Sequence, residues 1–394
     1  VVNRSDKNLK GIERFRPDIS EEDLDLRKKR LLNTRWPHTI GEDDWKYGVP
    51  NKWLREMIHY WANTWSWEKV VQEMRRYEHF KVEIEGISIH FLRSKGTKSN
   101  SIPIILTHGW PWTFWDFREV ITPLSSPKEK GSPSFDVIVP SLPGFGFSTP
   151  LTKAGVDVPT VAYLWNKLMT EVLGYESYAA HGGDWGSLIT AHLGHAYSDN
   201  VIGVHLGLPV VPGLIRSEIS DHYWDPKEKD LRDRADEAAP SLKSHLAVHT
   251  NDPHTLAHAL IDSPAGTAAW LWERRHNWSD NNGDIESVFS REDLCTNASL
   301  YWCTGAITSS LRMYFEHFNK PWPLAHGRQP VIESPTAYAI FPKDVVALPK
   351  KIVEEKTNLL RWTVMPAGGH FSAAEQPSLL VNDIQETFSQ LYNK

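Results

Sequence analysis

The sequence predicts an α/β protein with a mostly parallel, doubly wound sheet that is interrupted once by a helical insertion. Short runs of continuously apolar, often β-branched residues are typical of strands buried on both faces of a parallel sheet. Helical stretches at residues 160–173 and 187–196 alternate with these runs, and such alternation indicates a doubly wound sheet. The runs lie at residues 102–107, 135–139, 178–180 and 201–206.

The chain before this sheet is expected to form a helical arm and then a hairpin. Ser20, followed by Asp23 three positions later, is a typical cap for the first helix. Helical pattern continues over residues 52–77. Apolar residues then alternate on either side of Glu85 and Gly86, and this alternation predicts two antiparallel strands joined by a turn.

The strand signal disappears after residue 211, and helical pattern rich in tryptophan replaces it up to residue 330. Strands are expected again at residues 336–341 and 359–365, followed by a last helix at residues 373–391. A helical insertion within such a sheet predicts a lid. The expected organisation is an arm and hairpin at residues 1–95, a core at residues 96–211 and 331–394, and a lid at residues 212–330.

Composition excludes several classes of protein. At 394 residues and 45.0 kDa, folding buries roughly three quarters of the unfolded surface, so a large core is expected. A net charge of -6 without a cluster of Lys or Arg is unsuited to a nucleic-acid partner. No apolar run is long enough for a membrane span. The two cysteines cannot form a disulfide framework or a four-ligand zinc site.

The segment Gly182-Gly183-Asp184-Trp185-Gly186 lies between a predicted strand and the helix that follows it. A nucleophile elbow needs small residues two positions before and two after its central residue, because the turn is too tight for side chains there. Gly182 and Gly186 meet this requirement, and the central residue is Asp184. No Gly-x-Ser-x-Gly motif is present, which disfavours a serine hydrolase. The alternative is a glycine-rich turn with a helix-capping aspartate.

Three other loops carry the residues that would complete such a site. In an α/β-hydrolase fold, the elbow is followed along the chain by an acid and then by a histidine, each after a later strand. Asp344 and His370 occupy those places. Upstream, the motif HGWP at residues 108–111 follows a strand where this fold supplies a backbone N–H for an oxyanion hole. The amides of Trp110 and Trp185 are the expected pair.

Six short segments, spread over most of the chain, carry a resemblance to a known family. They are NTRWP, HGWP, PSLPGFGFS, GGDWGS, FPKD and GGHF, at residues 33–37, 108–111, 140–148, 182–187, 341–344 and 368–371. Together they resemble the microsomal-type epoxide hydrolases. The resemblance implies an α/β-hydrolase fold, a small-molecule epoxide as substrate and no cofactor. The family's membrane anchor is not found in this sequence, so a soluble relative, cytoplasmic or secreted, is expected.

The resemblance also implies two-step covalent catalysis that converts an epoxide to a vicinal diol. Asp184 opens the epoxide ring and forms an ester, and His370, oriented by Asp344, then activates the water that cleaves the ester. The family protonates the epoxide oxygen with two tyrosines of the lid. Tyr314 stands at one of these positions, and His245 stands at the other.

Tryptophans next to the catalytic segments are expected to line the substrate pocket. Trp110 and Trp185 are two of them, and their amides are expected to hold the charge on the ester carbonyl. Trp112 is the third, and it stands where the family commonly has a small residue. We therefore expect Trp112 to narrow the pocket.

Two alternatives share parts of this pattern. A haloalkane-type dehalogenase has the same fold and the same aspartate, and it would hold the halide with Trp185 and another tryptophan. A non-catalytic ligand-binding protein would keep the fold without the reaction, since fold does not fix function. Histidine pairs four residues apart, such as His245 and His249, lack the glutamate of a metalloprotease motif, so no metal site is predicted. Relatives of this type can dimerise, which makes a homodimer an expectation.

Overall fold

A mostly parallel sheet forms the centre of the computed structural model, which describes residues 11–40, 44–215 and 219–392. The first ten residues of the predicted arm lie outside this part. Within it the sheet has nine strands in the order β1-β2-β3-β5-β4-β6-β7-β8-β9. Neighbours from β1 to β5 are antiparallel, and neighbours from β5 to β9 are parallel. The strands are β1 (Ile12–Arg14), β2 (Glu78–Ile84), β3 (Ile87–Ser94), β4 (Ile102–Thr107), β5 (Phe135–Pro140), β6 (Tyr178–Gly182), β7 (Val201–Leu206), β8 (Ile332–Ile340) and β9 (Thr357–Val364).

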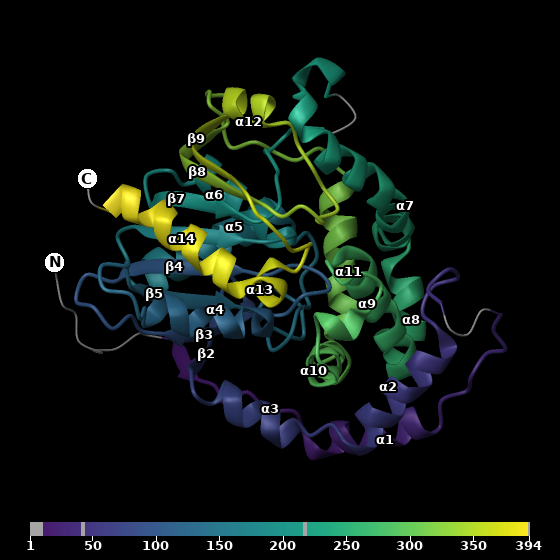
Figure 1. The fold of residues 1–394 in the computed structure, drawn as a ribbon. Coiled ribbons are helices and arrows are strands. Elements are labelled where there is room, and N and C mark those ends of the chain that lie inside the picture. The colour runs from purple at the N-terminus through teal and green to yellow at the C-terminus, as the bar shows by residue number, and fades with distance from the viewer. Residues whose placement is uncertain (1–10, 41–43, 216–218, 393–394) are drawn as a thin grey trace.

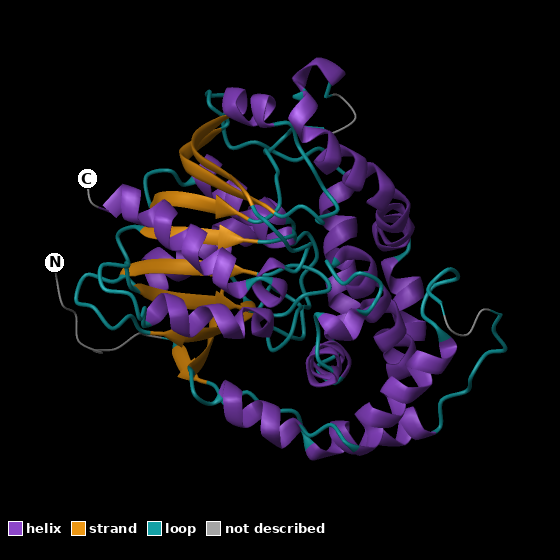
Figure 2. Cartoon of the chain, in the orientation of Figure 1, coloured by secondary structure: helices purple, strands orange, loops and turns teal. Residues whose placement is uncertain are grey.

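Helices lie on both faces of this sheet, which confirms the doubly wound prediction (Figure 1). The helices α4 and α14 pack together on one face, and α5 and α6 pack together on the other (Figure 2). The strands β4 to β7 are buried almost throughout, because each is covered on both sides. The bounds are α4 (Arg118–Ser125), α5 (Val158–Lys167), α6 (Trp185–Ala196), α12 (Lys350–Lys356), α13 (Ser372–Glu375) and α14 (Pro377–Tyr392).

Several local details differ from the sequence prediction, among them the short strand β1 in the arm. The helical pattern of residues 52–77 forms two helices rather than one, because the chain is extended at Ser66 between them. The expected last helix is divided before Pro377, whose ring lacks the N–H needed to continue a helix from α13. The helix α4 was not predicted, since Pro123 inside it is atypical of helices.

In the arm, β1 is followed by α1 (Glu21–Leu32), which Ser20 caps by accepting a hydrogen bond from the Asp23 amide, as predicted. Helices α2 (Asn51–Asn63) and α3 (Trp67–Met74) follow, and the arm runs along the lower edge of the molecule in Figure 1. Tryptophan indoles join the arm to the lid. Trp61 donates to Ser299 Oγ at 2.9 Å, and Trp65 donates to Thr296 Oγ1 at 3.2 Å. Tryptophans of the arm therefore hold the lid as well as fill the core.

Between β7 and β8, the described residues include five α-helices that form a separate layer beside the carboxyl ends of the parallel strands (Figures 1 and 2). We refer to them as the lid helices. They begin and end within the segment of residues 212–330, and each has several buried residues. They are α7 (Lys229–Asn251), α8 (Pro253–Asp262), α9 (Pro264–Trp278), α10 (Arg291–Trp302) and α11 (Ala306–Phe318).

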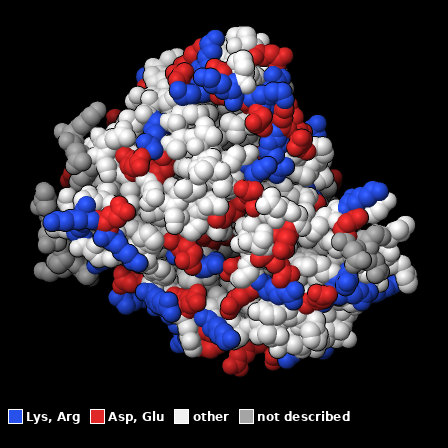
Figure 3. Space-filling view, in the orientation of Figure 1, with Lys and Arg blue, Asp and Glu red and all other residues white. Residues whose placement is uncertain are grey.

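The surface carries both signs of charge. Lys and Arg alternate with Asp and Glu over the face shown in Figure 3, and no large area of that face has a single sign. Among the described residues, none of the helices has the length and apolar character needed to cross a membrane.

Candidate active site

Asp184 occupies a strained turn between β6 and α6. Its backbone has φ 52° and ψ -126°, a region that a side chain normally avoids and that costs on the order of 1–3 kcal/mol. Small neighbours make the turn possible. A Cβ atom on Gly182 would collide with the Gly186 carbonyl, and one on Gly186 would collide with the Thr107 carbonyl. The glycine spacing in the sequence therefore reflects a steric requirement of this turn.

The register of the sheet brings the HGWP segment beside this turn. The strand β4 pairs with β6 so that Thr107 lies opposite Gly182, and the loops after both strands meet at one edge. The backbone N–H of Trp110 donates to Asp184 Oδ1 at 2.7 Å. A Cβ atom on Gly109 would overlap the same carboxylate. The Trp110 amide thus contacts this carboxylate, whereas no hydrogen bond from the Trp185 amide to it is seen in the described part of the chain.

His370 and Asp344 come together from the loops after β9 and β8. Their atoms Nδ1 and Oδ1 are 2.8 Å apart, and both side chains are buried. The Val345 amide donates to the same Asp344 oxygen at 2.6 Å and fixes its direction. The other nitrogen of His370, Nε2, lies 3.2 Å from Asp184 Oδ2. The structure therefore brings together three residues from separate loops, with His370 between Asp344 and Asp184.

The charge state of His370 follows from its two carboxylate neighbours. Burial by itself would lower the pKa of this imidazole, because it disfavours the charged form. The charges and hydrogen bonds of Asp344 and Asp184 outweigh burial and raise the pKa to about 10. Near neutral pH, His370 is therefore an imidazolium between two carboxylates.

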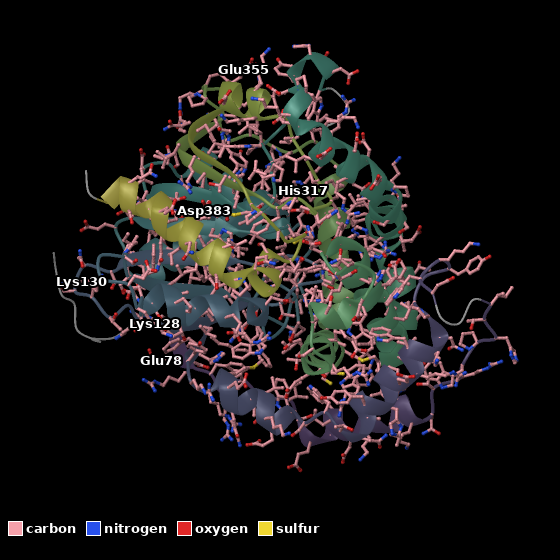
Figure 4. The ribbon with its side chains drawn as sticks, viewed as in Figure 1. Glu78, Lys128, Lys130, His317, Glu355 and Asp383 are labelled. Carbon is pink, nitrogen blue, oxygen red and sulfur yellow. The ribbon has the colours of Figure 1, made fainter. Side chains whose placement is uncertain are left out.

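The lid helix α11 carries Tyr314 to the same place. The Tyr314 ring lies edge-on to Trp185 and to Trp110, with ring centres 4.8 and 6.0 Å apart. Burial, and next to it the charge of Asp184, raises the pKa of Tyr314 well above its usual range. The phenol therefore keeps its proton and is available as a donor. His317, one turn further along α11, also lies edge-on to Trp185, where this helix meets the core (Figure 4).

His245 reaches the site from α7. Its ring stacks on Trp110 with ring centres 5.3 Å apart and lies at right angles to Tyr314. Burial lowers the pKa of His245 well below its usual range, and the nearby His249 and Arg274 lower it further. The imidazole is therefore neutral, so it can donate a hydrogen bond but is not the stronger, protonated acid. Its Nδ1 atom is buried and has no hydrogen-bond partner among the described residues.

A cavity of about 230 Å³ connects these groups. The Asp184 side chain, which is 18% exposed, reaches this cavity together with His370, Tyr314 and His245. Aliphatic side chains form most of the remaining wall, and Asp184 and His370 are the charged groups among the described lining residues. The other described lining residues, to which the sequence prediction gives no role, are Leu188, Leu208, Pro209, Val210, Val211, Leu214, Leu242, Leu246, Val345, Val346 and Leu348, with Trp278 and Phe318.

The predicted substrate-binding tryptophans are not placed alike. Trp185 lines the cavity, but Trp110 and Trp112 are not among its described lining residues. Trp110 contributes its backbone amide while its ring packs against the lid. Trp112 is fully buried behind His370 and against Phe371, so it supports the imidazole instead of narrowing the pocket. The Trp112 ring thus lies outside the described lining of the cavity.

Sequence reasoning missed the side chains that hold the HGWP loop from the lid. Asn297 Nδ2 donates to the Pro111 carbonyl at 2.9 Å, and Arg275 donates to the same carbonyl at 3.1 Å. Tyr301 donates to the Trp112 carbonyl at 2.6 Å. Polar residues at inward positions of otherwise apolar lid helices were the available signal, since a buried polar group needs a partner.

Fold and geometry together define an α/β hydrolase that has an aspartate, in place of a serine, at its elbow. The chain matches the family model described as "Epoxide hydrolase N terminus" over residues 12–117 and the model of the alpha/beta hydrolase fold over residues 102–376. It is 32% identical to epoxide hydrolase 1 of Sus scrofa, in an alignment that covers 95% of this chain and 88% of that protein.

Two solved structures are similar over nearly the whole chain. The structure of Aspergillus niger epoxide hydrolase has a TM-score of 0.83 and 26% identity, with 96% of each chain covered. The crystal structure of juvenile hormone epoxide hydrolase from Bombyx mori has a TM-score of 0.86 and 26% identity, covering 97% of this chain and 95% of that one. The chain therefore belongs to the epoxide hydrolase family. It is a hydrolase that acts on the ether bond of an epoxide, and the dehalogenase and pure binding alternatives are set aside.

Proposed function

We propose that this epoxide hydrolase works through a covalent ester on Asp184. The observation that supports this most is the position of its carboxylate at the wall of an apolar cavity. One carboxylate oxygen accepts a hydrogen bond from Trp110, and the other faces His370. A carboxylate in such surroundings has lost most of its water, which favours attack on an electrophilic carbon.

In the first step, Asp184 Oδ2 attacks an epoxide carbon, and the bond from that carbon to the ring oxygen breaks. The ring oxygen takes a proton from Tyr314, whose raised pKa keeps it protonated until then. The imidazolium of His370 returns a proton to the tyrosinate through the cavity. Esterification removes the charge of Asp184, so the pKa of His370 falls when a base is next required.

In the second step, neutral His370 removes a proton from water, and the hydroxide attacks the ester carbon of Asp184. Negative charge gathers on Oδ1, which the Trp110 amide already contacts. The diol oxygen leaves with the proton from His370, and the new carboxylic acid then returns a proton to the imidazole. Asp344 keeps His370 oriented throughout. The sum of both steps is epoxide plus water to vicinal diol.

Three further expectations remain proposals. We assign to the lid helices of residues 212–330 the roles of supplying Tyr314 and His245 and of excluding water. The wall of the cavity favours an uncharged, apolar epoxide, because a charged substituent would lose its hydration without gaining a partner. A homodimer rests on the family resemblance alone, and sedimentation equilibrium would test it.

The covalent route is tested by a single turnover in ¹⁸O-labelled water, with excess enzyme and a small aryl epoxide. The first diol must carry unlabelled oxygen from Asp184, and the label must enter the Asp184 peptide. The variant Asp184→Asn is expected to lose turnover by about 10⁴-fold or more, since removal of a nucleophile has effects of this size. Label entering the diol directly in the first turnover would refute the covalent route.

A further inference from the structure

One carboxylate joins the loop of His370 to the lid. Glu375, the last residue of α13, accepts the Gly369 amide with Oε2 at 2.8 Å and the Phe371 amide with Oε1 at 2.8 Å. Its Oε2 also accepts the amide of Asp280, in the lid loop after α9, at 2.7 Å. The amides on both sides of His370 and one amide of the lid therefore share a single side chain.

The lid loop holds the histidine loop in return. The Trp278 carbonyl accepts the backbone N–H of His370 at 2.8 Å. Asp280 Oδ2 accepts the Gly368 amide at 3.0 Å. A Cβ atom on Gly369 would lie 2.7 Å from the Trp278 carbonyl oxygen, so these two backbones can approach this closely only at a glycine.

The Glu375 carboxylate is the shared acceptor of these three amides. Hydrogen bonds to an ionised carboxylate are stronger than neutral ones, and three amides would lose theirs together if the carboxylate were removed. Two of these amides flank His370, whose imidazole must keep its 3.2 Å contact with Asp184. A small shift of that backbone therefore displaces the imidazole directly.

We propose that Glu375 is a positioning residue for the second step of the reaction. It holds His370 and the lid loop of residues 278–281 in one arrangement, so that water is activated beside the Asp184 ester. This inference rests on the proposed covalent function. It assigns Glu375 no contact with the substrate.

The proposal separates the two steps of the reaction. Ring opening depends on Asp184, in the turn before α6, and on Tyr314, which α11 carries. Ester hydrolysis depends on His370, whose loop is the one that Glu375 holds. Loss of the carboxylate is therefore expected to slow hydrolysis much more than ring opening, and the ester on Asp184 should accumulate.

The test is rapid quenching of Glu375→Gln during turnover of an aryl epoxide, with the Asp184 peptide measured by mass spectrometry. Burial raises the pKa of Glu375 to about 7 against the effect of the three amides, so the assay is run at about pH 8.5 to keep the carboxylate ionised. Gln has the same size, but its NH₂ group would face an amide donor. We expect ring opening within about 3-fold of the wild type and hydrolysis about 100-fold slower, as for misplaced catalytic groups.

The matched control is Glu286→Gln. Glu286 accepts from the Trp53 indole at 2.8 Å and pairs with Arg291, so it joins the arm to the lid without touching the histidine loop. Both steps should keep wild-type rates in this variant. Glu375→Asp keeps the charge on a shorter side chain and should restore part of the hydrolysis rate.

Two results would overturn the inference: equal slowing of both steps in Glu375→Gln, or a wild-type rate of hydrolysis. Thermal unfolding is measured alongside, and if Glu375→Gln fails to fold, Asp280→Ala removes the bond to Gly368 alone and should still slow hydrolysis about 10-fold. Failure of the proposed function is seen separately. In that case neither the wild type nor His370→Ala would trap an ester on Asp184.

Discussion

Two buried histidines face the same cavity, and they differ in charge: one is protonated and the other is neutral. His370 belongs to the core side, where the carboxylates of Asp344 and Asp184 raise its pKa to about 10. His245 belongs to the lid side, where burial among aromatic rings lowers its pKa well below the usual value. Burial opposes the charged form in both cases. The two carboxylates outweigh it at His370, whereas the neighbours His249 and Arg274 lower the pKa of His245 further. The core side thus supplies ionised groups, and the lid side supplies neutral donors.

The largest effect is expected from a substitution that makes the charge state of His370 resemble that of His245. Asp344→Asn removes one of the two charges that hold His370 protonated and leaves its tautomer unfixed. We expect ester hydrolysis to slow by about 10⁴-fold, as for the corresponding change in a serine protease triad. Rapid quenching before the steady state measures this rate. The ester on Asp184 should accumulate, because its hydrolysis is the step that is slowed.

The control for this change is Asp383→Asn. Asp383 lies on α14, away from the lid, and pairs with the buried His205 at 2.9 Å (Figure 4). This variant loses the same kind of buried pair and should lose stability, but its two catalytic steps should keep their ratio. A comparable block of hydrolysis in Asp383→Asn would contradict the special role of Asp344.

The second largest effect is expected on the lid side. Tyr314→Phe removes the proton donor without changing the shape of the ring, and ring opening should slow by about 100- to 1,000-fold, as on removal of an oxyanion donor. The rate of ester hydrolysis, measured in a single turnover, should change little. The matched control is Tyr178→Phe. The hydroxyl of Tyr178 donates a hydrogen bond to Asn166 inside the core. An unchanged rate of ring opening in Tyr314→Phe would show that Tyr314 of the lid is not the proton donor.

A smaller effect is expected for His245, because a neutral imidazole offers one hydrogen bond. His245→Phe should slow ring opening by about 5- to 10-fold, which corresponds to the net value of about 1 kcal/mol for one hydrogen bond. His245→Tyr restores the family's residue and should recover that loss. The kcat/KM of each variant is measured on one epoxide, and the two values are compared. Equal rates for Phe and Tyr at this position would show that His245 only packs.

The most general consequence is on stability. His370 has a folded pKa above its unfolded value of about 6.5, so its contribution is fully present below pH 6.5 and is lost as the pH rises toward 10. His245 has a folded pKa below that value, so it opposes folding as the pH falls below 6.5. The free energy of unfolding, measured with urea from pH 5 to pH 10, should therefore depend less on pH than in the wild type. This is expected on the alkaline side in His370→Gln and on the acid side in His245→Phe. Parallel curves for both variants would contradict the assigned charge states.

The positions of the central strands along the chain and the central turn were predictable because their signals are local. The apolar runs of β4, β5, β6 and β7 lie within the chain segment that forms each strand. The glycines at positions 182 and 186 are required by atoms of the turn and of the adjacent strand. Asp344 and His370 could be assigned because chain order in this fold fixes which loops meet. These predictions depend on short stretches of sequence or on the connection of strands.

The sequence by itself determined the fold class, the elbow and the identity of the groups that meet there. The tertiary structure alone decided that Trp112 packs behind His370, that Glu375 joins the histidine loop to the lid, and that two histidines of one cavity differ in charge. The physical reason is distance along the chain. Burial and electrostatic fields are sums over residues from many segments, and their value at one atom exists only once those segments have packed together.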